Sequence, residues 1–171
     1  MNTSLTMYAI GTIHTPHTEK NNTPVQPKFA RGIEGRVVVN EDLEPALDDL
    51  EGFSHICLIF HLHKSPKTVN LKVTPFLDTR KRGLFSTRSP SRPNPIGLSV
   101  VRLISRHKNI LKIEDVDMLD GTPLLDIKPY IPLLEADKAT HGWTDSLRDH
   151  TRDEIYKMGN RSRREDTPDT T

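Results

Sequence analysis

The chain has 171 residues, 34% of them hydrophobic and 27% charged, with a formal net charge of +1, which fits one globular domain with its own core. Its apolar runs are shorter than the roughly 18 residues that a membrane-spanning helix needs, so we expect no transmembrane segment. The N-terminus lacks a basic leader with a long apolar block, and the single cysteine, Cys57, offers no disulfide, so the sequence predicts a cytoplasmic protein.

Eight segments have the alternating or β-branched composition of strands. They are residues 7–15, 35–40, 55–63, 71–76, 83–87, 96–104, 110–119 and 124–132. Between the second and the third, Leu43, Leu47 and Leu50 recur at helical spacing. We expect Asn40 to cap this one internal helix and Gly52 to end it.

Two connections have the composition of tight turns. Residues 106–109 separate two strand segments as a hairpin would, and residues 119–123 hold an Asp-Gly pair suited to positive φ. Both indicate antiparallel neighbours. Short strands with so few helices favour a barrel or sandwich over a parallel sheet, and we expect a mainly β fold, a small β-barrel.

The chain changes character near its C-terminal end. We assign residues 1–135 to the barrel domain, residues 136–158 to a helical C-terminal extension with sparse apolar positions, and residues 159–171 to a disordered tail. In residues 17–32, Asn, Pro and Thr leave no periodicity, and we expect this stretch to be mobile.

Charge is distributed unevenly along the chain. Residues 64–108 hold eleven Lys or Arg and one acid, Asp78, whereas residues 41–51 hold six acids and no base. Such blocks are often solvated faces, but a basic stretch is also a candidate for phosphate contact.

The segment FSTRSPSRPNPIGLSV, residues 85–100, combines rigidity with hydrogen-bond donors. Pro90, Pro93 and Pro95 fix their own φ and push the preceding residues toward extended geometry, which excludes a helix. A PxxP ligand or a disordered Ser-Arg tail would need solvent on both sides, but strand segments flank this loop. We therefore expect an ordered loop.

Three side chains of this loop are candidate ligand contacts. Arg88 and Arg92 carry planar, permanently charged guanidinium groups, and Asn94 carries an amide with a donor and an acceptor. A rigid loop preorganises such groups and lowers the cost of binding. We expect them to hold an anion or RNA.

Two metal interpretations are weak. His61 and His63 are expected to share a strand face, but no third ligand and no Cys pair accompany them, so we predict no metal site. Residues 115–126 superficially resemble a calcium loop, but position five is Leu119 and Pro123 intrudes. These acids either bind a ligand or only cap the turn.

Five stretches together carry a resemblance to a known family. They are, in chain order, IGTIHTPH, QPK, GFSHICLIFHLH, GLFSTRSPSRPNPIGLSVVRL and DMLDGTPLLDIKPYIP. In this order they resemble the TsaA-like family, tRNA methyltransferases that act on N6-threonylcarbamoyladenosine beside the anticodon. The resemblance covers roughly residues 8–132.

The resemblance implies a single-sheeted β-barrel, a homodimer, S-adenosylmethionine as the methyl donor and the tRNA anticodon loop as partner. It also implies a set of cofactor-binding residues. These are Gln26, Pro27, Lys28, His63, Lys64, Arg88, Leu98, Asp117, Met118, Leu119, Asp120 and Gly121.

The chemistry of this reaction needs help with a proton, because the target nitrogen belongs to a urea-like group whose lone pair is delocalised. A general base contributes about 10²- to 10⁴-fold. Asp120 and His63 are the candidate catalytic residues, and Arg88, Arg92 and Asn94 the candidate substrate contacts. The alternative function is a β-barrel that binds RNA or an anion without catalysis.

Overall fold

The computed structural model describes residues 3–136, 138–147, 150, 151 and 153–155. Within them the strands are β1 (Gly11–His14), β2 (Glu34–Val39), β3 (His55–His61), β4 (Lys72–Val73), β5 (Arg82–Gly83), β6 (Ile96–His107), β7 (Ile110–Glu114) and β8 (Thr122–Pro129). Short 3₁₀ helices are η1 (Lys20–Asn22), η2 (Pro27–Phe29), η3 (Glu41–Leu47), η4 (Leu50–Gly52), η5 (Leu84–Ser86), η6 (Pro132–Leu134) and η7 (Gly142–Leu147).

The chain divides into two compact units. Unit 1 comprises Met1–Ser65 and Asn94–Ile131, and unit 2 comprises Pro66–Pro93 and Pro132–Thr171. The division into residues 1–135, 136–158 and 159–171 stays a prediction. The third of these ranges lies outside the described residues, and in the second η7 and residues 153–155 are helical.

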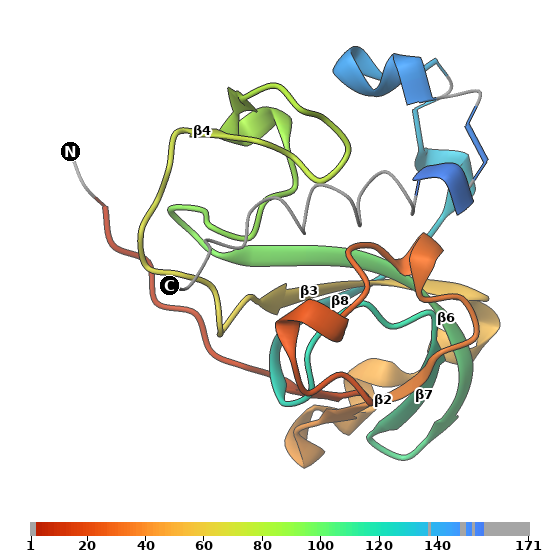
Figure 1. Ribbon diagram of the computed structural model, residues 1–171. Coiled ribbons are helices and arrows are strands. Elements are labelled where there is room, and N and C mark those ends of the chain that lie inside the picture. Colours follow the sequence, from red (N-terminus) through yellow and green to blue (C-terminus); the bar gives the residue numbers. More distant parts are fainter. Residues whose placement is uncertain (1–2, 137, 148–149, 152, 156–171) are drawn as a thin grey trace. The chain divides into compact units, whose positions relative to one another are not determined.

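Unit 1 is a closed β-barrel with the strand order β1-β2-β7-β6-β3-β8 (Figure 1). Every neighbouring pair is antiparallel, and β8 closes the barrel by pairing with both β1 and β3. The mainly β barrel expected from the strand pattern is therefore confirmed. Closure leaves none of the six strands with an unpaired edge.

The core of the barrel follows from strand alternation. In β3 every second residue is buried, and in β6 the same alternation runs from Ser99 to Leu103. The core side chains are Ile13, Val37, Val39, Leu47, Ile56, Leu58, Phe60, Val101, Leu103, Leu111, Ile113, Val116, Met118 and Leu124. Gly97 is the residue opposite Phe60, and a Cβ atom there would overlap the phenyl ring.

The internal helix is present as two 3₁₀ turns, η3 and η4. η3 continues past Pro45 to Leu47, and the break between the two segments comes at Asp48, which is extended, and Asp49, which has a φ of 64°. Asn40 is the N-cap residue of η3 and η4 ends at Gly52, both as expected, but Asn40 makes no side-chain cap hydrogen bond, and its Nδ2 donates to the Ala9 carbonyl at 3.3 Å.

The two predicted tight turns had different outcomes. β6 and β7 form the predicted hairpin, with Lys108 at φ 54°. Gly121 has the expected positive φ of 73°, but its turn does not join neighbours, because β8 pairs with β1 and β3 rather than β7. The preceding strand ends at Glu114 instead of continuing to residue 119.

The segment between β3 and β6 leaves the barrel at one point. The Leu62 N–H donates to the Pro95 carbonyl at 2.7 Å, directly beyond the paired ends of the two strands. Because β3 ends at His61, the expectation that His61 and His63 share a strand face is wrong. His63 lies in a tight turn, its N–H donating to the His61 carbonyl at 2.8 Å.

Unit 2 contains little regular structure. Its strands β4 and β5 form a two-stranded sheet of their own, and residues 84–86 of the expected strand 83–87 form η5 instead. Residues 87–95 contain no helix, as the prolines predict. Across the described part of both units, we find no helix with the length and apolarity needed to cross a membrane.

Candidate functional site

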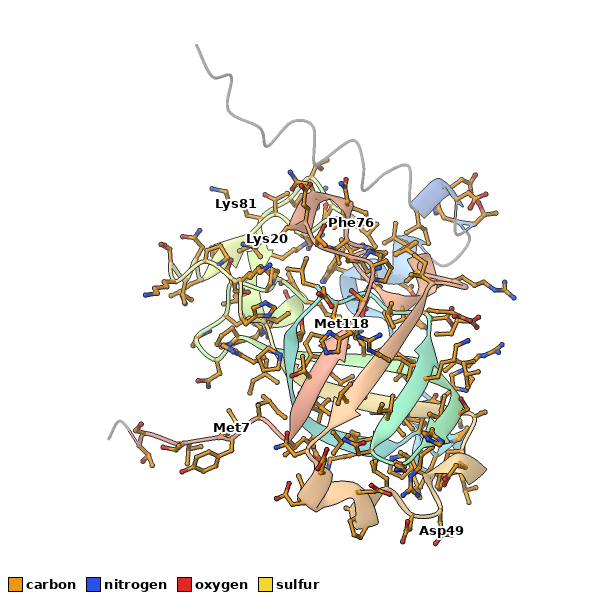
Figure 2. All side chains as sticks on the ribbon, turned by 90° about the horizontal axis from the view of Figure 1, so that it is seen from below. Met7, Lys20, Asp49, Phe76, Lys81 and Met118 are labelled. Atoms are coloured by element: carbon orange, nitrogen blue, oxygen red, sulfur yellow. The ribbon has the colours of Figure 1, made fainter. Side chains whose placement is uncertain are left out.

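The loop from Asp115 to Gly121 connects β7 to β8 at one end of the barrel, and long-range hydrogen bonds fix it. Thr15 Oγ1 donates to the Met118 carbonyl at 2.8 Å, and the Asp120 N–H donates to the His17 carbonyl at 2.7 Å. The Met118 side chain is buried inside the barrel (Figure 2). Met118 is 3% exposed as a whole residue, so it orders the loop from inside and offers little surface to a ligand.

His17 is a structural histidine of this loop. Its side chain is buried, and Nε2 lies 3.0 Å from the Val116 carbonyl, to which it donates because a carbonyl only accepts. The His17 N–H in turn donates to Thr15 Oγ1 at 3.1 Å. This bonding ties the chain after β1 to the loop.

Asp120 serves as an acceptor within the same network. Its Oδ1 accepts from the Thr15 N–H at 3.1 Å and lies 3.2 Å from His14 Nδ1. The Thr15 N–H lowers the pKa of Asp120, desolvation opposes this shift, and His14 lowers the pKa further. Asp120 is therefore an ionised carboxylate that orders the loop, and such an acid is a weak general base at neutral pH.

His63 has the opposite electrostatic setting. Burial lowers its pKa below the ordinary 6.5, and the charge of Lys64 lowers it further, while a hydrogen bond to the His61 backbone opposes the shift. The imidazole is therefore neutral at pH 7. A neutral imidazole has one nitrogen with a free lone pair for a proton.

The Thr122 hydroxyl lies near one ring nitrogen of His63. The buried Thr122 hydroxyl donates its hydrogen to the Leu119 carbonyl at 2.6 Å, so toward His63 Nδ1, 3.5 Å away, it can only accept. At 3.5 Å this contact is at the outer limit of a hydrogen bond, and it is compatible with a proton on Nδ1 and a lone pair on Nε2. It also places His63 beside the 117–121 loop.

Asp117, in the loop between β7 and β8, accepts a hydrogen bond from a residue of strand β6. Ser99 is 3% exposed on β6, and its Oγ donates to Asp117 Oδ1 at 2.7 Å. The next residue back along β6, Leu98, points outward and is 53% exposed. A carboxylate and an apolar side chain from these two elements thus lie at the same end of β6.

The predicted residues of η2 belong to unit 1 as well. Gln26 precedes η2, Pro27 and Lys28 lie within it, and η2 contacts strand β6. Lys28 and Lys64 are both exposed. Residues 17–32 adopt two 3₁₀ turns, and their mobility stays a prediction.

The three candidate ligand contacts of the proline-containing loop, residues 87–95, belong to different units. Arg88 is exposed and belongs to unit 2, as does Arg92. Arg92 Nη1 donates to the Thr87 carbonyl at 2.9 Å and to the Ser89 carbonyl at 3.3 Å, so part of this guanidinium orders the loop itself. Asn94 is exposed in unit 1, and its carbonyl accepts from the Ile96 N–H at 2.8 Å.

Unit 1 therefore brings several of the predicted site residues together: His63 and Lys64 lie beside the loop 117–121. It adds residues that the sequence analysis did not identify: Thr15, Ser99 and Thr122. Strand alternation carries a signal for two of them, because Ser99 and Thr122 are polar residues at inward positions. Thr15 follows β1 and has no such signal.

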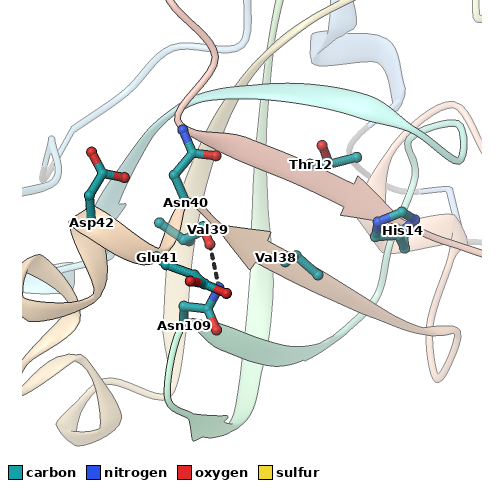
Figure 3. A pocket seen from close by; sticks show the side chains of 8 residues that line it. All are labelled: Thr12, His14, Val38, Val39, Asn40, Glu41, Asp42 and Asn109. Atoms are coloured by element: carbon teal, nitrogen blue, oxygen red, sulfur yellow. Dashed lines mark hydrogen bonds between the residues drawn. The ribbon is translucent and has the colours of Figure 1, made fainter.

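A surface depression lies elsewhere in unit 1. It has a volume of about 700 Å³, is wide open to solvent, and is lined by β1, β2 and the start of η3 (Figure 3). His14 lines it, but none of the predicted cofactor-binding residues does. We therefore do not assign it to the candidate site. Among the described residues, no cluster of three or more His, Cys, Asp or Glu side chains is arranged to hold a metal ion.

Comparisons with known proteins identify relatives of this chain. A probable S-adenosyl-L-methionine-binding protein of Pyrococcus abyssi is 50% identical over 137 residues, which are 80% of this chain and 74% of that protein. The tRNA (adenine(37)-N6)-methyltransferase of Escherichia coli is 36% identical over 136 residues, 74% of this chain and 58% of that enzyme.

A solved structure has the same fold. The crystal structure of TrmO from Pseudomonas aeruginosa is similar with a TM-score of 0.68 and 32% sequence identity, over 94% of this chain and 75% of that one. The family model of the tRNA-methyltransferase O N-terminal domain matches residues 12–136. The chain therefore belongs to the tRNA-methyltransferase O N-terminal domain family.

Proposed function

We propose that this protein transfers a methyl group from S-adenosylmethionine to N6 of N6-threonylcarbamoyladenosine beside the tRNA anticodon. The observation that carries the proposal is the neutral His63 next to the ordered 117–121 loop, in a chain of this family. The match to the Escherichia coli tRNA (adenine(37)-N6)-methyltransferase supports the reaction, although this chain spans only 58% of that enzyme.

The residues of unit 1 fit a cofactor of this chemistry. S-adenosylmethionine, when bound, supplies a methyl group activated by a sulfonium. The exposed Leu98 side chain suits an adenine face, and the Asp117 carboxylate suits ribose hydroxyls or an ammonium group. The backbone of residues 118–121, together with Gln26–Lys28 and Lys64, supplies further polar contacts and positive charge for a carboxylate.

His63 is the general base of the proposed reaction. The N6 nitrogen attacks well only when its proton leaves, and the free nitrogen of a neutral imidazole accepts a proton near pH 7. Thr122 orients the ring through the other nitrogen. Asp120 orders the loop as a carboxylate instead of taking the proton.

Arg88, Arg92 and Asn94 bind anions of the substrate, either the threonyl carboxylate or a phosphate. Arg92 does so with the guanidinium nitrogens left after its bonds to Thr87 and Ser89. The basic composition of residues 64–108 supports tRNA as the partner. We also propose a homodimer located in the cytoplasm, on the strength of the family resemblance.

The test is methyl transfer with purified components. The protein is incubated with S-adenosylmethionine and with tRNA that carries the threonylcarbamoyl group, and the digested nucleosides are weighed by mass spectrometry. We expect one added methyl group on the modified adenosine, and none on tRNA that lacks the threonylcarbamoyl group. No methyl gain, while a control methyltransferase modifies the same tRNA, would reject the enzyme.

The alternative, an RNA-binding barrel without catalysis, gives a different result in the same assay. It predicts tRNA binding that weakens steeply as salt rises, with no consumption of S-adenosylmethionine. Turnover of the cofactor therefore decides between the two functions.

A further inference from the structure

Phe85 is an exposed aromatic side chain in the proline-flanked part of unit 2. Its side chain is 76% exposed on the short helix η5, whereas its neighbour Leu84 is 2% exposed and anchors the same turn. A single exposed apolar side chain is common on protein surfaces, so the role of Phe85 has to be argued from what surrounds it. The proposed function gives Phe85 no role.

The backbone beneath Phe85 is held from both sides. The Thr87 N–H and hydroxyl donate to the Leu84 carbonyl at 3.1 and 2.8 Å, and Ser86 Oγ donates to the Gly83 carbonyl at 2.8 Å. Trp143 Nε1, also in unit 2, donates to the Ser86 carbonyl at 2.7 Å. A ring on such a turn is presented in a fixed orientation, which lowers the entropic cost of binding.

A fixed cation accompanies the ring. The Arg92 guanidinium lies over Phe85 at 5.6 Å from the ring centroid, and its Nη1 donates to the Thr87 carbonyl at 2.9 Å. Arg92 therefore cannot swing away without losing that hydrogen bond. Since the ring is still mostly exposed, the pair leaves aromatic surface available to a ligand.

The surrounding segment carries strong positive charge. Residues 66–93 contain seven Lys or Arg and one acid, Asp78. That acid is already paired, because Arg82 Nη2 lies 2.6 Å from Asp78 Oδ2. Exposed cations remain along the segment, and Figure 2 shows Lys81 projecting from the ribbon.

We infer that Phe85, backed by Arg92, is a stacking platform for an unpaired RNA base, with the cations of residues 66–93 contacting the neighbouring phosphates. An exposed aromatic ring within a basic surface is the combination by which proteins hold single-stranded RNA. RNA fits this segment better than a protein partner does, because three of its seven cations are lysines, a residue type depleted at protein–protein interfaces. The inference deepens the proposed function, since it rests on tRNA as the substrate and assigns this residue to a base of its loop.

The test is RNA binding by Phe85 variants, measured as fluorescence anisotropy of a labelled anticodon-arm hairpin at several salt concentrations. Because stacking of a base on an aromatic side chain contributes measurably to RNA affinity, Phe85→Ala should weaken RNA binding about 5- to 100-fold. The slope of log affinity against log salt should stay unchanged, because no charge is removed. Phe85→Tyr keeps the ring and should bind within about twofold of the wild type.

A matched control comes from the same unit. Leu71 is 74% exposed but not aromatic, so Leu71→Ala should leave binding unchanged. Equal losses in Leu71→Ala and Phe85→Ala would overturn the inference, as would wild-type binding by Phe85→Ala or no RNA binding by the wild type. Thermal melting checks that both variants remain folded.

The stacking inference and the methyltransferase proposal can be rejected independently of each other. If the wild type methylates tRNA but Phe85→Ala binds the hairpin normally, the stacking inference is wrong and the methyltransferase stands. If the wild type transfers no methyl group but Phe85→Ala loses RNA affinity as expected, the enzyme proposal is wrong and the stacking platform stands.

Discussion

Ser99 Oγ donates a hydrogen bond of 2.7 Å to Asp117 Oδ1, which joins the interior of β6 to the loop before β8. Along β6 the inward positions that follow are Val101 and Leu103, so Ser99 is the polar member of an apolar row. A buried hydroxyl needs a partner, and the Asp117 carboxylate provides one. We regard Ser99 as a positioning residue for Asp117.

Ser99→Ala should therefore weaken cofactor binding. Losing a hydrogen bond to a charged acceptor should raise the Kd for S-adenosylmethionine about tenfold or more, with kcat at saturating cofactor little changed. Calorimetric titration and steady-state kinetics measure the two effects. Ser105→Ala removes an exposed hydroxyl from the same strand and serves as the control. An unchanged Kd in Ser99→Ala would remove the positioning role.

The activity should depend on pH through His63. Burial and the charge of Lys64 lower the pKa of His63 below 6.5, so the free base is present at neutral pH and is lost as pH falls through this lowered pKa. The profile of log kcat/KM against pH, which reports the free enzyme, should therefore show an acid limb with a midpoint below 6.5. In His63→Gln the limb should vanish and kcat should fall about 10²-fold or more. If His63→Gln keeps the acid limb, a residue other than His63 is the general base.

Asp120→Asn tests the ordering role of the loop carboxylate. The Thr15 N–H holds the pKa of Asp120 below its ordinary 3.8, so the charged form stabilises the fold at neutral pH, and this stabilisation is lost as pH falls through the lowered pKa. We expect a loss of about 0.5–1 kcal/mol at pH 7, kept small because the carboxylate is 45% exposed. Denaturant unfolding at pH 7 and below pH 3 measures the difference, which should shrink in acid. A kcat loss as large as that of His63→Gln would return Asp120 to a catalytic role.

Arg88→Ala should abolish most of the activity and leave the fold intact. Exposed loop residues contribute little to stability, whereas a charged hydrogen bond to an anion should contribute about 10- to 100-fold in kcat/KM. Arg36→Ala, an exposed arginine outside the basic residues 64–108, is the control. Normal turnover by Arg88→Ala would show that the site assignment is wrong even with the family correct.

Gly97→Ala should destabilise the barrel. A Cβ atom at this position would overlap the ring of Phe60 on the paired strand, so strand or ring must shift, at a cost of about 1–3 kcal/mol. At Gly52, where a Cβ meets nothing within 4 Å, Gly52→Ala should change stability far less. Chemical denaturation of the two variants gives the comparison, and equal stabilities would contradict the close packing of Gly97 on Phe60.

The places of the six barrel strands were predictable because buried and outward side chains alternate along them, as in β3, whereas the two expected strands of unit 2 were reduced to two residues each. The loop after β7 was not predictable, since its early departure depends on a distant contact. Asp115 has a φ of 69°, and its Oδ1 accepts from the Gly32 N–H at 2.8 Å. No local pattern reveals a partner that lies so far away in the sequence.

The candidate site was likewise predictable in its residues but not in their contacts. His63, Asp117 and Asp120 were identifiable as residues with useful chemistry, but their different electrostatic roles follow from neighbours in space. Thr15 and His14 hold Asp120 in its charged form, and burial keeps His63 neutral. The sequence offered both as equal candidates for the base, and only the folded environment distinguishes them.

The hydrogen bond between Leu62 and Pro95 has an evolutionary consequence. The bond joins the chain just beyond the paired ends of β3 and β6. The 32 residues between Leu62 and Pro95 therefore begin and end at one point of the barrel. Insertions, deletions or exchanges within these residues leave the strand register of the barrel undisturbed. Beyond His63 and Lys64, the part of this segment that contacts RNA can therefore diversify while the strand pairing of the barrel stays constant.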